Sequence, residues 1–162
     1  MIKIFTTGGT IGGLEYVNST DRSLEDSIDI SIFLKAPNIS DSYTIDYLLD
    51  KDSRHITLED RELIRDRIKL SKEERIVITH GTYTMIDTAK YLGKLNLKKT
   101  IVITGSFILG SEKHSDAPFN LGFAIGALKF LENGVYIAMN GEVFLHGNVV
   151  KNMQENRFER KF

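Results

Sequence analysis

The sequence contains no cysteine and only two prolines. Without cysteine the chain has no disulfide, no thiolate zinc site, no Cys-ligated iron–sulfur cluster and no cysteine nucleophile. Covalent chemistry would therefore use Thr, Ser, Lys, Tyr or a carboxylate. The histidines His80, His114 and His146 lack the spacing of a metal site, with no His-x-x-x-His and no mixed carboxylate pattern. We expect no metal and no cofactor, with His80 packed in a turn and the other two on the surface.

An excess of one charge is also missing, because 21 Lys and Arg residues are balanced by 22 Asp and Glu residues. Such a chain has no broad positive field to hold a phosphate backbone, so we expect no nucleic-acid partner. No stretch approaches the roughly 20 apolar residues of a membrane span, and the apolar start at residues 1–5 is too short for a signal peptide. These absences favour a cytoplasmic enzyme or binding domain without a membrane partner.

Short apolar runs, mostly rich in β-branched residues, predict buried strands. They lie at residues 2–5, 76–78, 101–103 and 135–139, with a further strand expected at 43–49. Segments with helical periodicity lie at residues 58–70, 87–95 and 119–131. From the first of these helices onward the order is αβαβαβ, which predicts a parallel sheet with right-handed crossovers.

Local signals place some of the boundaries of these segments. Thr57 with Asp60 resembles a capping box, and Asp116 followed by Pro118 is typical of a helix start. Residues 143–150 resemble a hairpin turning around His146 and Gly147. With no linker or repeat in the sequence, we expect one α/β domain over residues 1–162. It should be Rossmann-like, with a mostly parallel sheet flanked by helices and a crevice at the carboxyl ends of the strands.

Each predicted buried strand is followed by small polar residues and glycine. These turns are residues 6–10, 79–82, 104–106 and 140–141. Glycines let backbone N–H groups approach a ligand closely, and the hydroxyls can act as nucleophiles or hydrogen-bond donors. Residues 8–13 match neither a Walker loop nor a dinucleotide fingerprint, so nucleotide binding is only a weak alternative.

The motifs at these turns resemble those of the bacterial-type L-asparaginases. They are Thr-Thr-Gly-Gly-Thr-Ile-Gly from Thr6, Ile-Thr-His-Gly-Thr-Tyr-Thr-Met from Ile78, Ile-Thr-Gly-Ser from Ile103 and Ser-Asp-Ala-Pro-Phe-Asn-Leu from Ser115. The match is to the N-terminal domain of full-length asparaginases, over nearly the whole chain, and is strongest to the short, single-domain form. The resemblance therefore implies one N-terminal-type domain over residues 1–162, without the C-terminal asparaginase domain.

The resemblance also implies a reaction, the hydrolysis of L-asparagine to L-aspartate and ammonia through an acyl-threonine. Thr10 matches the nucleophile, Thr82 and Lys151 match a supporting pair, and Tyr16 matches, more loosely, a tyrosine that helps activate the nucleophile. A threonine hydroxyl needs a base to take its proton, and a lysine kept neutral by burial or by nearby cations can do so. The expected substrate-binding residues are Gly9, Ser53, Arg54, Gly81 and Tyr83.

Two positions depart from the usual pattern of this family. Tyr83 replaces the Asp that receives the α-ammonium of the substrate, and a phenol is uncharged near neutral pH. Arg54 follows Ser53 and could clamp a carboxylate, although alone it would be read as surface charge. Two alternatives therefore stay open. One is a weak or inactive module that binds an amino acid or anion, and the other is a glutaminase-like component of an amidotransferase that needs a partner chain.

The resemblance and the sequence both favour a homo-oligomer. Full-length asparaginases complete each site with a second domain from a neighbouring copy, and the resemblance to the short form implies that this chain does without that domain. The small residues Gly122, Ala124, Gly126 and Ala127 predict a helix face that another backbone can approach closely. We expect a homodimer or a tetramer, although tight packing of this helix on its own sheet explains the small residues equally well.

Overall fold

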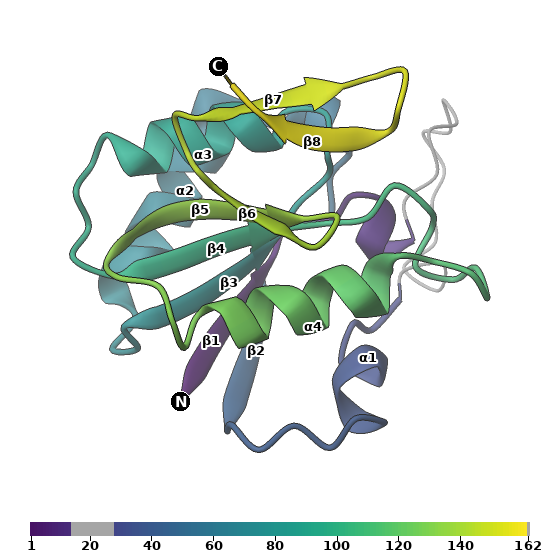
Figure 1. The fold of residues 1–162 in the computed structure, drawn as a ribbon. Helices are drawn as coiled ribbons and strands as arrows, with labels where there is room; N and C mark the ends of the chain where they lie inside the picture. Colours follow the sequence, from purple (N-terminus) through teal and green to yellow (C-terminus); the bar gives the residue numbers. More distant parts are fainter. Residues whose placement is uncertain (14–27, 162) are drawn as a thin grey trace.

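In the computed structural model, residues 1–13 and 28–161 are described, and they form a sheet between two layers of helices (Figure 1). The strands are β1 (Ile2–Thr6), β2 (Tyr43–Tyr47), β3 (Arg75–Thr79), β4 (Thr100–Thr104), β5 (Gly134–Met139), β6 (Glu142–Leu145), β7 (Val149–Asn152) and β8 (Arg157–Arg160). The helices are α1 (Ile32–Lys35), α2 (Leu58–Leu70), α3 (Met85–Gly93) and α4 (Ala117–Ala127), with 3-10 turns at Thr10–Gly12 and Ser53–His55. In this part of the chain no helix is long and apolar enough to cross a bilayer.

The described strands form a six-stranded sheet in the order β2-β1-β3-β4-β5-β6, with β7 and β8 as a separate pair. All neighbours in the large sheet are parallel except β5 and β6. The central strand β4 is buried at every position, which explains its unbroken run of β-branched residues. The expected α/β class and mostly parallel sheet are confirmed.

Apolar side chains fill the space on both faces of this sheet. Helices α2 and α3 cover one face, and the pair β7–β8 lies on the same side (Figure 1). The buried residues there include Phe5, Ile78, Ile103, Val149 and Phe158. Helices α1 and α4 cover the opposite face, over Ile4, Val77, Val102, Leu121 and Ala124. Because both faces are covered, the strand ends are where polar groups can meet a ligand.

The helix starts predicted at Thr57 and at Asp116 are confirmed, with one unexpected contact. Thr57 and Asp60 form a reciprocal capping box at the start of α2. Asp116 occupies the position just before α4, but its side chain accepts none of the first N–H groups of that helix. Its carboxylate instead accepts the N–H groups of Phe107 and Ile108, at 3.0 to 3.1 Å. The acidic group therefore fixes the turn after β4, close to the strand ends.

The predicted hairpin at residues 143–150 is wrong. β6 pairs instead with β5, through a turn at Asn140 and Gly141 in which both φ angles are positive. Asn-Gly is the preferred pair for such a two-residue hairpin turn. β7 pairs with β8, so that Lys151 lies opposite Phe158.

Candidate active site

Backbone hydrogen bonds continue past the strand ends and hold the turns side by side. The N–H of Thr7 donates to the carbonyl of Thr79 at 3.1 Å, and the N–H of His80 donates to the carbonyl of Thr104 at 2.8 Å. The N–H of Lys51 donates to the carbonyl of Thr7 at 3.2 Å. The turns after β1, β2, β3 and β4 therefore share one edge of the sheet, where ligands bind in open parallel sheets.

The turns that carry Thr10, Thr82 and Ser53 touch through glycines. Gly9 has a φ of +82°, and a Cβ there would lie 2.5 Å from the backbone nitrogen of Gly81. A Cβ on Gly81 would lie 2.6 Å from the Oγ of Ser53. Glycine is thus required at both positions by close approach, and at Gly9 also by its backbone angle. This contact brings the expected site residues of three separate segments together.

Ser53 and Thr10 are both buried at this edge. The Oγ of Ser53 accepts the N–H of Tyr83 at 3.1 Å, and its carbonyl accepts the hydroxyl of Thr84. The carbonyl of Thr10 accepts the N–H of Gly110 at 3.0 Å, which fixes the turn after β1 against the segment after β4. The two side chains are therefore held on turns that are anchored from outside their own strands.

Lys151 reaches the site from β7 and contacts Thr82. Its Nζ donates to the Oγ1 of Thr82 at 2.9 Å, although the two residues are 69 positions apart. The same Nζ lies 5.0 Å from the ring centroid of Tyr83 and 5.3 Å from that of Phe107. Burial lowers the pKa of Lys151 below the ordinary 10.5. This favours the neutral amine, which can accept a proton.

The pair β7–β8 is anchored so that Lys151 is held in place. Phe158, opposite Lys151, is buried in the core beneath α3, and its ring centroid lies 5.9 Å from that of Phe107. Its N–H donates to the Oδ1 of Asn140 in the β5–β6 turn, at 3.1 Å. One aromatic ring, Phe107, thus contacts both the lysine and the residue that anchors its strand.

Arg54 lies beside Tyr83 and is paired within its own turn. Its Nε and Nη2 donate to one carboxylate oxygen of Asp52, at 3.0 and 2.6 Å, and its guanidinium carbon lies 5.8 Å from the Tyr83 ring centroid. Burial acts to raise the pKa of Asp52, but the hydrogen bonds from Arg54 outweigh it and the pKa is lowered. The Asp52 carboxylate is therefore ionised and engaged by the cation next to it.

His80 is buried and packed in its turn, as expected. Its Nδ1 lies 2.8 Å from the carbonyl of Gly81, so this nitrogen carries the proton and donates it to the carbonyl. The other nitrogen, Nε2, therefore accepts the hydroxyl of Thr88, at 2.9 Å. Arg61 in turn donates to Thr88 at 3.1 Å. Burial lowers the pKa of His80 to about 4, so the ring is neutral and serves to hold the Gly81 turn.

The other two histidines differ from each other. His114 is exposed, as expected. The expectation for His146 holds only in part, because the residue is half-buried and its ring packs against Gly93, where a Cβ would lie 2.4 Å from it. Its Nδ1 is buried and has no hydrogen-bond partner among the described residues. A glycine late in α3 makes room for this ring, a contact that no sequence spacing indicates.

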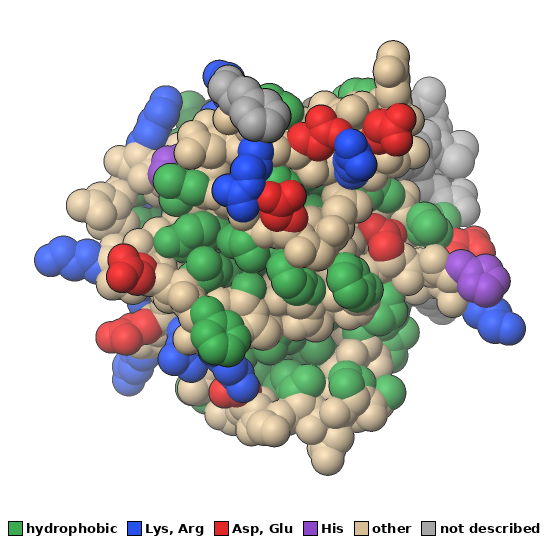
Figure 2. Space-filling view, viewed as in Figure 1, with side chains coloured by type: hydrophobic (Ala, Val, Ile, Leu, Met, Phe, Trp, Pro, Cys, Tyr) green, Lys and Arg blue, Asp and Glu red, His purple; other side chains and the backbone are tan. Residues whose placement is uncertain are grey.

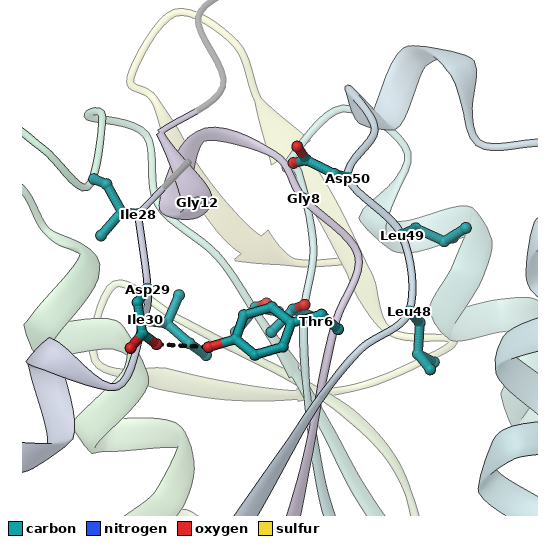
Figure 3. Close-up of a pocket in the computed structure, with 11 residues that line it drawn as sticks. Thr6, Gly8, Gly12, Ile28, Asp29, Ile30, Leu48, Leu49 and Asp50 are labelled. Atoms are coloured by element: carbon teal, nitrogen blue, oxygen red, sulfur yellow. Dashed lines mark hydrogen bonds between the residues drawn. The ribbon is translucent and has the colours of Figure 1, made fainter. Parts of the chain in front are cut away.

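A cavity of about 390 Å³ adjoins the Thr10 turn on the side of β2 (Figure 3). Its wall includes Gly8, Ile30, Leu48 and Leu49, and on one side the Tyr47 hydroxyl donates to the Asp29 carboxylate. Asp50 lies beside Gly8 at the rim (Figure 3). One wall of the cavity belongs to the motif that begins at Thr6, but the opposite wall comes from residues 28–30 and 47–50, which carry no motif. The sequence therefore did not indicate a cavity here. Tyr16, the expected activating tyrosine, lies outside the described residues.

A comparison with known proteins agrees with this arrangement of turns. The sequence model of the family described as "Asparaginase, N-terminal" matches residues 1–160. The chain therefore belongs to the asparaginase family. It is 30% identical to the glutaminase-asparaginase of Acinetobacter glutaminasificans, with 93% of this chain and 49% of that protein covered. The chain spans half or less of the length of the curated relatives that it matches.

A solved structure and a more distant relative complete the comparison. The crystal structure of a probable cytoplasmic L-asparaginase from Campylobacter jejuni superposes with a TM-score of 0.81 at 32% identity, covering 98% of this chain and 52% of that chain. One component of the glutamyl-tRNA(Gln) amidotransferase of Methanococcus vannielii is 29% identical, with 88% of this chain and 34% of that component covered.

Proposed function

We propose that the chain is an asparaginase-type amidohydrolase that converts the side-chain amide of L-asparagine, or of a closely related small molecule, into a carboxylate and ammonia. The observation that carries this proposal is the 2.9 Å hydrogen bond between the Lys151 amine and the Thr82 hydroxyl. It lies at a strand-end edge where the turn of a second threonine, Thr10, is in direct contact with the turn of Thr82. Two hydroxyls and one amine with a lowered pKa are the groups that acyl transfer through threonine needs.

In the proposed reaction the Thr10 hydroxyl attacks the carbon of the amide and loses its proton. The C–O bond forms as the amide carbonyl becomes an oxyanion, which the backbone N–H groups of the glycine-rich turns stabilise. Collapse of this intermediate breaks the C–N bond and releases ammonia. Water then attacks the acyl-threonine and regenerates the hydroxyl. Thr82 and Lys151 accept and return the protons of these steps.

Ammonia release by purified variants tests this mechanism. Thr10→Ala, which removes the proposed nucleophile, should abolish the release of ammonia from L-asparagine, L-glutamine and their close analogues. Thr44→Ala is the matched control, because Thr44 lies exposed on the edge strand β2, away from the turns of the site. If Thr10→Ala released ammonia as fast as the unaltered protein, Thr10 would not be the nucleophile.

An anion-binding module is the second candidate, and the environment of Tyr83 favours it. This exposed tyrosine lies beside two cations, Lys151 and Arg54, and adds no negative charge. Failure of the unaltered protein to release ammonia above the Thr10→Ala background, together with measurable binding of a dicarboxylate, would support this candidate. Ammonia release only in the presence of a second protein would support a role within an amidotransferase instead, in line with the similarity to the Methanococcus vannielii protein.

We also propose that copies of the chain associate as a homodimer or tetramer. The small residues of α4 divide between two sides: Ala124 is buried against the sheet, whereas Gly122 and Gly126 have open space where a Cβ would stand. Beside them the rings of Phe119 and Phe123 stack 6.2 Å apart, and Phe119 is 60% exposed. Figure 2 shows apolar side chains gathered on this face of the molecule. A second copy of the same face would cover them.

A further inference from the structure

The charges around Lys151 and Thr82 give the site a substrate preference. We propose that it favours small monoamides that carry a carboxylate but no ammonium group beside it, over the corresponding amino acid. The class is the monoamide of a four-carbon dicarboxylic acid, of which succinamate is the simplest member. Succinamate is L-asparagine without its amino group, so the two molecules differ only in the feature on which the preference depends. This inference rests on the proposed amide hydrolysis and specifies its substrate.

No carboxylate of the described residues is paired with Lys151. Among residues 1–13 and 28–161, no Asp or Glu forms an ion pair with this lysine. Its neighbours are the Thr82 hydroxyl and the rings of Tyr83 and Phe107. When Lys151 carries its proton, an ammonium group placed here would meet a like charge without compensation, whereas a carboxylate would be attracted.

The acidic groups on the adjoining turns are already engaged. Asp52 binds the guanidinium of Arg54 and accepts the backbone N–H of the same residue at 2.8 Å. Asp116 accepts the N–H groups of Phe107 and Ile108 and the side-chain amide of Asn120. A substrate ammonium at either carboxylate would compete with hydrogen bonds that hold the site's own turns.

The Tyr83 ring is also occupied by cations. An aromatic ring can attract an ammonium group, and Tyr83 is 51% exposed. This ring, however, already lies within 5.8 Å of the Arg54 guanidinium carbon and 5.0 Å of the Lys151 amine. Asp52 offsets the charge of Arg54, so a third cation would be repelled chiefly by protonated Lys151. The same lysine attracts an anion that approaches the ring, so the arrangement favours a ligand with negative charge only.

Asp50 is the acidic residue against which this inference must be tested. It is exposed at the rim of the cavity beside Gly8 (Figure 3). An ammonium group on a substrate that extended toward that cavity could reach it. The variant Asp50→Asn removes this charge while keeping the size of the side chain.

The experiment compares matched pairs of ligands on the intact protein. Ammonia release is measured with succinamate and with L-asparagine, and binding of the products succinate and L-aspartate is measured by isothermal titration calorimetry. We expect kcat/KM for succinamate to exceed that for L-asparagine by roughly tenfold or more, because one uncompensated like-charge contact is removed. Succinate should bind more tightly than L-aspartate by a similar factor.

Two variants test the cause of the preference. Tyr83→Asp places a carboxylate beside Lys151 and Arg54 and should reverse the preference toward L-asparagine. Leu70→Asp adds the same charge at an exposed position at the end of α2 and should leave the preference unchanged. Asp50→Asn should also leave it unchanged. A loss of L-asparagine hydrolysis in Asp50→Asn would instead assign the ammonium to Asp50 and overturn the inference.

The outcomes separate this inference from the proposed function. Hydrolysis of both amides with equal or better use of L-asparagine overturns the inference and leaves amide hydrolysis intact. If neither amide is hydrolysed, the proposed function is overturned. The binding of succinate and L-aspartate alone then decides the charge preference. Tighter binding of succinate would uphold that preference in a binding module, whereas equal binding or no binding of the two products would overturn it.

Discussion

The amine of Lys151 is held by an unusual set of neighbours for a half-buried cation: one hydroxyl and two aromatic rings. Removal from water disfavours its charged form, while the rings attract that form. The net effect of burial is a pKa below 10.5. A lysine in this setting can exchange protons with Thr82 without a carboxylate to hold it in the protonated state.

This environment predicts the pH dependence of the proposed reaction. A general base works only when neutral, so kcat/KM should rise with pH, with a midpoint below 10.5 that reports Lys151. Lys151→Met should remove this rise and lower the rate by about 10²- to 10⁴-fold, the usual contribution of acid–base catalysis. The groups that face the amine are Thr82, Tyr83 and Phe107. The variant Phe107→Leu removes one of the two rings without adding charge, so it tests whether that ring affects the pH midpoint.

The control for this profile is Lys161→Met, which removes an exposed lysine just after β8. It should leave both the rate and the pH midpoint unchanged. A Lys151→Met variant that retained the full rate would show that another group accepts the proton.

His80 predicts a loss of stability in mild acid. Its pKa is about 4 in the folded protein, because of burial, and about 6.5 in an unfolded chain. Since the unfolded chain binds the proton first, stability is complete above about pH 6.5 and falls as the pH drops toward 4. The loss should be on the order of 3 kcal/mol, following the linkage between pKa shifts and stability.

Urea unfolding at several pH values between 7.5 and 4 measures this effect. The His80→Gln variant should be less stable at neutral pH, because it loses a hydrogen bond, but its stability should depend less on pH. The carboxylates titrate in both proteins, so the difference between the two curves isolates His80. Parallel curves would mean that His80 is protonated equally in the folded and unfolded chains.

The strands and helices were largely predictable because their signals are local. β-branched runs predicted β1, β3, β4 and β5, and the capping box placed the start of α2 at Leu58. Helix α3 begins two residues earlier than expected, at Met85, whereas α4 begins at Ala117, between the Asp116 and Pro118 that predicted its start. The pairing of β6 was mistaken because the Asn140–Gly141 turn resembled another strand-end loop.

The contacts of the site were predictable only in part. Contact between the strand-end turns follows from the parallel sheet, since carboxyl ends share one edge. The Lys151–Thr82 contact has no periodic signal, because it joins a separate β pair to a turn 69 positions earlier, and only the family resemblance indicated it. The arrangement of Phe107 and Tyr83 around the amine depends on side-chain packing, which no spacing encodes.

The β7–β8 pair depends on Phe158 for its place on the core. Phe158→Ala should lower the free energy of unfolding by about 3 to 5 kcal/mol, as is typical of a buried aromatic residue. Because Phe158 lies opposite Lys151, the variant should lose catalytic rate even at temperatures where circular dichroism shows the sheet to be folded. Full activity in the folded variant would mean that Lys151 is positioned without this anchor.

For the chain as an assembly, the apolar face of α4 predicts self-association. Sedimentation velocity should give a dimer or tetramer, and Phe119→Glu should shift the population toward the monomer by placing charge in the contact. Lys90→Glu is a useful comparison, because it also changes the charge at an exposed position, on helix α3 at the opposite face of the sheet. A monomer in the unaltered protein at high concentration would rule the oligomer out.

The lysine of the site is supplied by a part of the sequence that follows all six strands of the main sheet. During synthesis on the ribosome, Thr10, Thr82 and the strands of that sheet emerge before Lys151 and its anchor Phe158. Val149 and Phe158 of this later segment complete the core on one face of the sheet. Under the proposed mechanism hydrolysis begins only when the β7–β8 pair has docked. Ammonia release would then report the docking of this pair, which the formation of the main sheet alone does not.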